Sequence, residues 1–206
     1  MPSCVFRVAT DPPAERSVNP ITHYLASWTL ASLPGGLRRA DRAWIIVAGV
    51  APDLDGLGIV AELATRDSAT PLLWWSEYHH TLGHNALFGA VVAAGVLACT
   101  RRPKVAGLAL VSFHLHLLCD LAGSRGPDGY QWPIPYLWPF SSAVNLTVPW
   151  QWQLNAWPNI ALSVVLLAYS LWVSYAAGRS PLEPFWSSGN RALVAALRGR
   201  FSSLRK

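Results

Sequence analysis

Long apolar runs separated by short polar connections make up most of this chain. Three of them, at residues 85–100, 104–122 and 160–178, are strong candidates for membrane helices, close to the lower length limit of a spanning helix. Two shorter runs, at residues 21–33 and 43–50, are too short to cross alone. They are either half-buried helices packed on the bundle or longer helices whose ends the pattern leaves open. The pattern predicts an all-α fold, a helical integral membrane bundle of about four to five helices.

Composition supports this prediction and indicates three parts of the chain: an extension, a membrane-embedded domain and a basic tail. Of the 206 residues, 52% are hydrophobic and 13% charged, about half the charged share of a soluble domain. The membrane-embedded domain is expected at residues 21–178. Residues 1–20 lack the apolar core of a cleavable signal peptide and are expected to be a flexible extension. Residues 179–206 are expected to form a basic amphipathic tail on the anionic inner leaflet, with partner binding as the alternative.

The distribution of positive charge predicts the orientation of the chain. The formal net charge is +5, but the basic residues gather in loops between apolar runs, so no nucleic-acid partner is expected. An alternating path across the membrane places three basic groups on one side. Cytoplasmic loops are enriched in Lys and Arg, so this side and the C-terminus are expected in the cytoplasm, in a bacterial inner membrane. The groups are Arg38, Arg39 and Arg42; Arg101, Arg102 and Lys104; and Arg179, Arg191, Arg198, Arg200, Arg205 and Lys206.

Histidines carry the candidate chemistry. All six lie between positions 23 and 116. His80 and His84 are four residues apart, and so are His116 and Asp120, so each pair shares one face of a helix. His79 and His84 converge only if His79 precedes the regular helix. Ionisable residues beside membrane helices are costly and usually functional, so these pairs predict a metal site; interfacial histidines bonded to backbone, or a structural His116–Asp120 hydrogen bond, are the alternatives.

Four further residues complete the picture. Asp53 and Asp55 occur in GVAPDLDGLG, where Pro52 is expected to end a helix and glycines to permit a tight turn. Both carboxylates can point at one cation, although a solvated turn or an N-cap is the commoner explanation for such a pair taken alone. His114 lies about 200° around the helix from His116, so it is expected to face away and bond to a neighbouring helix. His23 is a lone histidine near a helix start.

A Gly-, Pro- and Trp-rich loop is predicted at residues 123–158. Its five tryptophans suit an aromatic belt at the membrane–water interface, and the same loop can cover one face of the bundle and roof a site there. Arg125 and Asp128 lie in it as candidates for contact with a charged substrate.

Five motifs in order resemble one known family. They are THYLAS, PDLDG, the histidine cluster HHTLGHN opening an apolar helix, HxxxD at the end of the next helix, and LWPFS. Over residues 21–142 they resemble the YdjM-like family of membrane-bound metal-dependent hydrolases, which is LexA-regulated in one lineage. That family commonly has His, then Arg-Gly, then Thr-His, which maps its two histidines onto His79 and His84. Here His80 and Thr81 replace Arg-Gly, so the choice between His79 and His80 as ligand stays open.

The resemblance implies a metal-ligand set and a reaction class. By its mapping the metal ligands are His23, Asp53, Asp55, His79, His84, His116 and Asp120. A distant similarity to zinc-dependent phospholipase C implies two or three divalent ions, with zinc favoured and manganese or iron as alternatives. The implied activity is hydrolysis of an ester or phosphoester, a lipid among them, by metal-activated water at the non-cytoplasmic membrane face. Asp55 and an unligated histidine, His79 or His80, are the candidate catalytic groups.

Two other functions fit intramembrane His and Asp residues. One is a metal-ion or proton-coupled transporter, although transporter ligands usually lie near the bilayer midplane. The other is a membrane protein with a structural metal, which would lack a coordination position open to water. The lipid bilayer is the partner that the sequence predicts, and the oligomeric state is left open.

Overall fold

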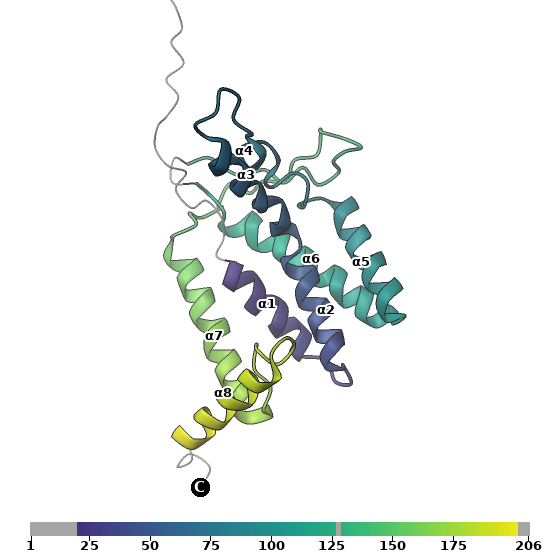
Figure 1. Cartoon of the computed structure of the whole chain (residues 1–206), viewed down its shortest axis with the longest axis vertical. Helices are drawn as coiled ribbons and strands as arrows, with labels where there is room; N and C mark the ends of the chain where they lie inside the picture. The colour runs from purple at the N-terminus through teal and green to yellow at the C-terminus, as the bar shows by residue number, and fades with distance from the viewer. Residues whose placement is uncertain (1–19, 127–128, 202–206) are drawn as a thin grey trace, which may run out of the picture.

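The computed structural model describes residues 20–126 and 129–201 (Figure 1). These residues form eight α-helices and one 3-10 helix, and they contain no strand beyond two isolated bridges. The predicted all-α fold is therefore confirmed. The elements are α1 (Pro20–Ser32), α2 (Arg39–Val50), η1 (Pro52–Leu57), α3 (Gly58–Thr65), α4 (Trp74–Tyr78), α5 (Ala86–Thr100), α6 (Pro103–Gly123), α7 (Trp157–Ala177) and α8 (Ser187–Arg200).

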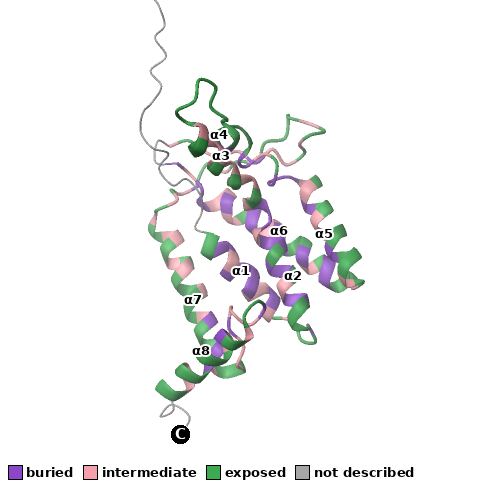
Figure 2. Cartoon of the chain, in the orientation of Figure 1, coloured by how far each residue is buried: buried purple, intermediate pink, exposed green. Residues whose placement is uncertain are grey.

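Five helices make up the bundle, and α6 lies at its centre. Helix α6 packs on α1, α2 and α5, while α7 packs on the outer side of α1. Trp28, Ile45 and Ala109 belong to the buried core between α1, α2 and α6. Figure 2 shows buried residues on the facing sides of these helices and exposed apolar residues along α5 and α7. Helices that are apolar on their outer faces suit a lipid environment.

Local sequence explains where the bundle helices begin and end. Asn85 caps α5, since its side chain accepts a hydrogen bond from Phe88 N at 2.8 Å. Pro103 occupies the first turn of α6, where its missing N–H costs nothing. Gly178 ends α7 with φ of 70°, the left-handed conformation that glycine adopts without strain.

Helices α6 and α7 are long and apolar enough to cross a membrane. Helix α2 and the segment 52–65 pass the same test only together, with a bend of 57° between them. Helix α5, with 15 residues, is shorter than a span requires. Of the three strong candidates from the sequence, two therefore have full spanning length.

The segment around Pro52 differs from the prediction. Helix α2 ends at Val50, just before Pro52, as predicted, but the expected tight turn at Gly56 and Gly58 is wrong. The chain continues as η1 and then α3, because proline is tolerated in the first turn of a new helix. Gly58 serves a close approach instead: a Cβ there would lie 2.8 Å from the backbone of Trp74. Glycine thus lets α3 and α4 pack together.

The basic residues that precede α2 and α6 lie at one end of the bundle. Asp41 at the start of α2 forms ion pairs with Arg38 and with Arg102, which precedes α6. Arg42 pairs with Glu183 at 2.6 Å, which joins α2 to the segment before α8. The predicted extension at residues 1–20 lies outside the described residues except for Pro20, as do Asp128, Arg205 and Lys206.

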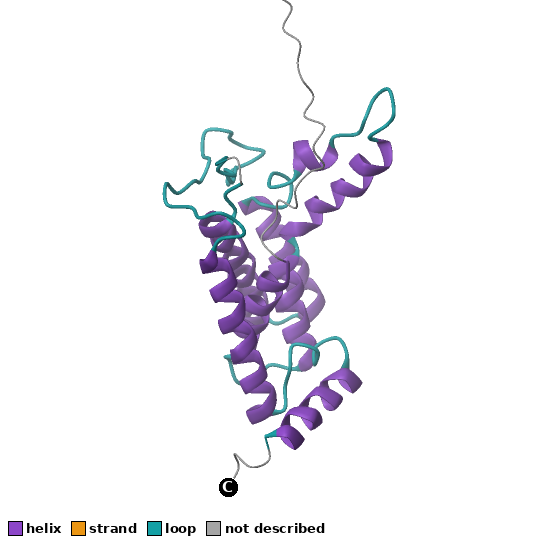
Figure 3. Ribbon diagram, turned by 90° about the vertical axis from the view of Figure 1, so that its left-hand side faces the viewer, coloured by secondary structure: helices purple, strands orange, loops and turns teal. Residues whose placement is uncertain are grey.

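The opposite end carries two irregular structures. Helices α3 and α4 pack on each other and on η1, and they form a hairpin that projects from the bundle (Figure 3). The loop between α6 and α7 lies at the same end, on the other side in that view. Between them lie the histidines and aspartates.

Candidate metal centre

Four segments bring the candidate ligands together at the end opposite the basic residues. Helix α1 contributes one histidine, η1 two aspartates, the turn before α5 three histidines, and α6 a histidine and an aspartate. All are buried except the two aspartates of η1, which are partly buried. We call this set the histidine–aspartate cluster: His23, Asp53, Asp55, His79, His80, His84, His116 and Asp120.

Four side chains point their ligand atoms at one common volume. His116 Nε2 lies 3.0 Å from Asp120 Oδ2, 3.3 Å from His84 Nε2 and 3.6 Å from Asp53 Oδ1. His84 Nε2 lies 3.3 Å from the same oxygen of Asp120. Two ligands about 2.0–2.2 Å from one ion, at angles of about 90–110°, are about 3.0–3.5 Å apart. These separations match the edges of a coordination polyhedron.

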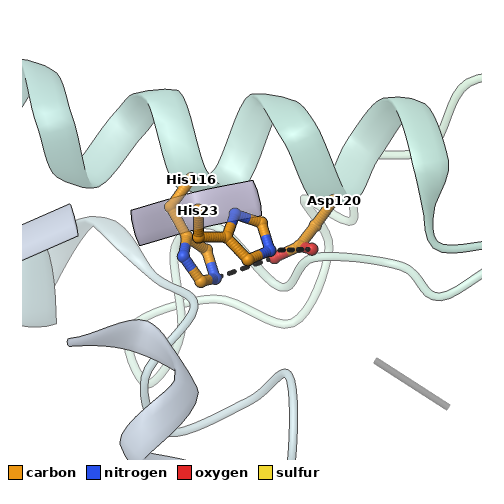
Figure 4. Close-up of side chains that lie close together, drawn as sticks. All are labelled: His23, His116 and Asp120. Carbon is orange, nitrogen blue, oxygen red and sulfur yellow. Dashed lines mark ion pairs between the residues drawn. The ribbon is translucent and has the colours of Figure 1, made fainter. Parts of the chain in front are cut away.

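Two more histidines extend the site on either side of this volume. His23 Nε2 lies 3.3 Å from Asp120 Oδ1, and its ring stacks on His116 with centroids 3.8 Å apart (Figure 4). His80 stacks on His84 with centroids 4.4 Å apart. Three groups have ligand atoms mutually within 4.8 Å: His23, His116 and Asp120; Asp53, His84 and His116; and His80, His84 and Asp120. Shared members place the groups side by side, as in sites that hold several ions.

Hydrogen bonds fix the tautomers of the two central histidines. His116 Nδ1 lies 2.9 Å from the carbonyl oxygen of Gly49. A carbonyl only accepts, so Nδ1–H donates and Nε2 keeps its lone pair when the ring is neutral. His84 Nδ1 contacts Asp55 Oδ2 at 3.1 Å in the same way. Two Nε2 lone pairs then face each other at 3.3 Å, which is repulsive unless a proton or a cation lies between them. Metal-ligating histidines are usually oriented in this manner.

Asp55 uses both oxygens for orientation. Oδ1 accepts from His79 Nδ1 at 2.8 Å, and Oδ2 accepts from His84 and from the Gly83 backbone N–H, the latter at 2.9 Å. Asp55 and His79 belong to none of the three ligand groups. Gly83 is required here, because a Cβ would collide with the backbone of Pro52 and come within 3.1 Å of Asp55 Oδ2.

Several buried polar atoms of the cluster have no hydrogen-bond partner. Buried polar groups in proteins are nearly always satisfied. A cation in the common volume would give a partner to those atoms whose lone pairs face it. The atoms are both ring nitrogens of His23, Asp53 Oδ2, Asp120 Oδ2, His79 Nε2 and His80 Nδ1.

His80, rather than His79, joins a ligand group. His80 has φ of 66°, a conformation that non-glycine residues adopt rarely and mostly where function requires it. Burial and the neighbouring His84 lower the pKa of His80 well below its usual value, which keeps the ring neutral and able to bind metal. His79 points its free Nε2 elsewhere, and its ring stacks on Trp75 with centroids 5.2 Å apart.

A cavity of about 520 Å³ opens beside the cluster. His79 and His80 line one wall, and Trp75, Trp132 and Asn145 contribute to the others. Trp132 comes from the loop between α6 and α7 and lies 4.6 Å from His80 between ring centroids. The volume falls in the range of small-molecule binding sites.

His114 faces away from the cluster, but its partner differs from the prediction. Its Nε2 lies 2.9 Å from the hydroxyl of Tyr136 and its Nδ1 bonds to Leu110 O within α6. The expected bond to a neighbouring helix is therefore wrong, because the loop folds back over this half-buried face. Arg125 donates to Gly129 O at 3.3 Å and so supports the loop itself.

Three contributors to the site were not predicted from the sequence. The Gly49 carbonyl orients His116, the Ser124 hydroxyl donates to Asp120 Oδ1 at 3.0 Å, and Gln151 Nε2 donates to the Asp120 carbonyl at 3.0 Å. Backbone atoms and loop side chains become neighbours only through tertiary packing, so no spacing rule finds them. Ser124, four residues after Asp120, is the one whose helical spacing offered a signal.

Comparison with known proteins gives one match. The family described as YdjM inner membrane protein matches residues 18–197 of this chain. No curated protein and no solved structure matches it.

Proposed function

Because this chain belongs to the YdjM family of inner membrane proteins, we propose that it is a membrane-bound, metal-dependent hydrolase of an ester or phosphoester. One observation carries the proposal: His84 Nε2, His116 Nε2 and two carboxylate oxygens converge at 3.0–3.6 Å on a common volume. Membership of the family supports the membrane location, whereas the proposed reaction rests on this geometry.

The donor set fits a divalent ion, with zinc favoured by imidazole and carboxylate ligands. Asp53, His84 and His116, whose ligand atoms lie mutually within 4.8 Å, would hold one ion. His23 beside Asp120, and His80 beside His84, would hold a second and a third. A bound ion of this kind supplies acidity to a coordinated water and stabilises negative charge on the reacting ester.

The remaining members of the cluster support the reaction. Asp55 orients His84 and His79 instead of serving as a ligand, since both its oxygens accept hydrogen bonds. His79 donates Nδ1–H to Asp55 and lines the cavity, while its buried Nε2 has no hydrogen-bond partner. It is thus our candidate general base, accepting a proton from the attacking water.

The position of the cluster separates this function from its rivals. Transporter sites lie near the bilayer midplane between repeated halves, whereas this cluster lies at one end of α6. A structural metal needs no adjoining space, whereas a cavity of about 520 Å³ adjoins His79 and His80. Both features favour hydrolysis.

Two histidines on one helix provide the experiment. Purified protein would be analysed for bound metal and assayed on soluble phosphoesters and esters with chromogenic leaving groups. We expect His116→Ala to lose metal and to reduce the rate by orders of magnitude, while His114→Ala, the matched control, keeps both. Full metal content and full activity in His116→Ala would refute the proposed centre, and wild-type protein that binds metal but hydrolyses nothing would favour a structural metal or transport.

A further inference from the structure

The hairpin beside the cluster exposes an unusual amount of apolar surface. We call residues 54–78, comprising most of η1 together with α3 and α4, the arm. Helix α3 buries no residue. Soluble proteins rarely expose a contiguous apolar surface of this kind unless something covers it. Eight large apolar side chains of the arm are each at least 40% exposed: Leu54, Leu57, Val60, Leu63, Leu72, Leu73, Trp74 and Tyr78.

The lipid bilayer is the occupant that suits this surface. Together, helix α2 and residues 52–65 are long and apolar enough to span a membrane. A bend of 57° between them turns residues 52–65 away from the direction of α2 (Figure 3). An apolar helix that continues from the bundle and then turns is expected to lie in the interface between headgroups and chains.

Polar residues of the arm occupy the places that an interfacial location requires. Arg66 and Asp67 pair at 3.4 Å at its exposed tip. Glu62 accepts hydrogen bonds from the Ser76 hydroxyl at 2.7 Å and backbone N–H at 3.0 Å, so its charge is partly satisfied between the two helices. Trp74 and Tyr78 are residue types enriched at membrane interfaces.

The loop between α6 and α7 adds aromatic surface at the same end. Phe140, Trp150 and Trp157 are strongly exposed. The loop and the arm lie at the same end of the bundle (Figure 3), and Trp132 of the loop and Trp75 of the arm contact His80 and His79. Two interfacial elements at one end of the bundle place the cluster close to lipid headgroups.

The arm is joined directly to the cluster. In η1, Asp53 and Asp55 face the histidines, while Leu54 and Leu57 between and beside them are exposed. In α4, Trp75 lines the cavity and the adjacent Trp74 is exposed. In both places, adjacent residues of one short helix contribute to the apolar surface and to the site.

We infer that the arm lies in the leaflet interface and that the substrate is a membrane lipid, whose headgroup enters the cavity while its chains stay against the arm. The identity of the substrate rests on the proposed hydrolysis, whereas the location of the arm does not. In the reaction, water adds to the carbonyl carbon or phosphorus, the bond to the leaving oxygen breaks, and the proton from water passes to that oxygen. The lipid and one water molecule are the only reactants that this step consumes.

Lipid quenching tests the location of the arm. A fluorophore sensitive to polarity would be attached to Val60→Cys in full-length protein lacking its three native cysteines, reconstituted in phosphatidylethanolamine–phosphatidylglycerol vesicles. We expect lipids with a quencher on the acyl chain to reduce its emission several-fold more than that of the same label at Ser68→Cys, near the tip. Equal, weak quenching at both positions would overturn the inference, whether or not the protein has activity.

A comparison of vesicle phospholipid with a soluble phosphoester tests whether the arm delivers lipid to the site. Val60→Asp with Leu63→Asp places two charges on the apolar face, and Ser68→Asp with Thr70→Asp places the same charge at the exposed tip. We expect the first pair to lower hydrolysis of vesicle phospholipid by about tenfold or more, with bound metal and the rate on a soluble phosphoester unchanged. The second pair should change neither rate.

The outcomes separate the two claims. If wild-type protein hydrolyses soluble phosphoesters but not vesicle phospholipid or carboxylic esters of lipids, the lipid inference fails and the proposed function stands. If it hydrolyses neither and the label at position 60 is quenched, the hydrolase proposal and the lipid-substrate inference fail, and the interfacial location of the arm stands.

Discussion

Asp55 is the residue on which the histidine geometry depends. It accepts hydrogen bonds from His79 and His84 and from the Gly83 N–H. In Asp55→Asn an amide NH₂ replaces one acceptor and faces an imidazole N–H, so one ring must turn or change tautomer. Loss of such an orienting carboxylate typically weakens metal binding by about 10–100-fold.

Competition with a chromophoric chelator measures that change. Asp67→Asn, at an exposed position of the arm, is the control and should bind metal as the wild type does. Unchanged affinity in Asp55→Asn would show that packing alone orients the two histidines. Complete loss of one ion would instead make Asp55 a ligand, as the family resemblance implies.

The His84 imidazole gives the metal-free protein a pH dependence. Burial lowers its pKa, but contacts with Asp120 and Asp55 outweigh burial and raise the pKa to about 9. An unfolded histidine titrates near about 6.5, so the stabilisation is fully present below that pH and is lost as the pH rises through about 9. The melting temperature of metal-free protein in detergent should therefore fall over this range.

Bound metal should reverse the slope. A divalent ion replaces the proton on His84, and its binding strengthens as protons become scarce. Zinc-loaded protein should keep or gain melting temperature between about pH 6.5 and about pH 9. His84→Gln should flatten the curve of the metal-free protein. A falling curve of the same size in His84→Gln would assign the dependence to another group.

Sequence spacing located part of the cluster and failed on the rest for identifiable reasons. His116 and Asp120 are four apart on a regular helix, so their shared face was predictable. The prediction that His80 and His84 share one face of a helix is wrong, because α5 begins only at Ala86 and His80, with φ of 66°, lies in an irregular turn. Asp55 was recognisable as a polar group, but whether it binds metal or histidines depends on where the turn before α5 lies.

At the scale of elements, the crossing of α1, α2 and α6 has no room for a side chain at Gly49. A Cβ there would lie 2.8 Å from Ser27 Cβ and would also collide with the Ser112 hydroxyl. Gly49→Ala should force the helices apart and cost about 1–3 kcal/mol of stability, as overpacking does. It should also weaken metal binding, since the Gly49 carbonyl orients His116.

Gly107→Ala is the matched control, because nothing lies within 4 Å of a Cβ at that position of α6. In a helix interior this change removes backbone freedom and stabilises by about 0.5–1 kcal/mol. Thermal unfolding in detergent, with metal titration of both variants, measures the two effects. Equal melting temperatures for the two variants would contradict the tight crossing.

Element prediction succeeded where hydropathy was continuous and failed where helices changed direction. Helices α6 and α7 follow from apolar runs bounded by Pro103 and Gly178. The helices of the arm were not predicted from the sequence, because a proline can either end a helix or begin a new one. The close approach of Gly58 to Trp74, which decides for a second helix, involves residues 16 positions apart.

At the scale of the whole molecule, the arginine-rich loops and the histidine–aspartate cluster lie at opposite ends of the bundle. Asp41 joins Arg38 to Arg102, and Arg42 binds Glu183, so ion pairs tie the loops of the basic end together. The histidine–aspartate cluster and the arm lie at the other end. The distribution of Lys and Arg predicted this division, since loops that alternate across a membrane return to the same side.

The division predicts the sidedness of the protein in cells. Arginine- and lysine-rich loops stay in the cytoplasm, so position 104, at the basic end, should be cytoplasmic. Position 140, in the strongly exposed part of the loop near the cluster, should be outside. In a cysteine-free background, a membrane-impermeant thiol reagent should label Phe140→Cys in spheroplasts and label Lys104→Cys only after the membrane is opened. Labelling of position 104 alone in closed spheroplasts would reverse the orientation and place the hydrolysis, and the leaflet that supplies its lipid, on the cytoplasmic side.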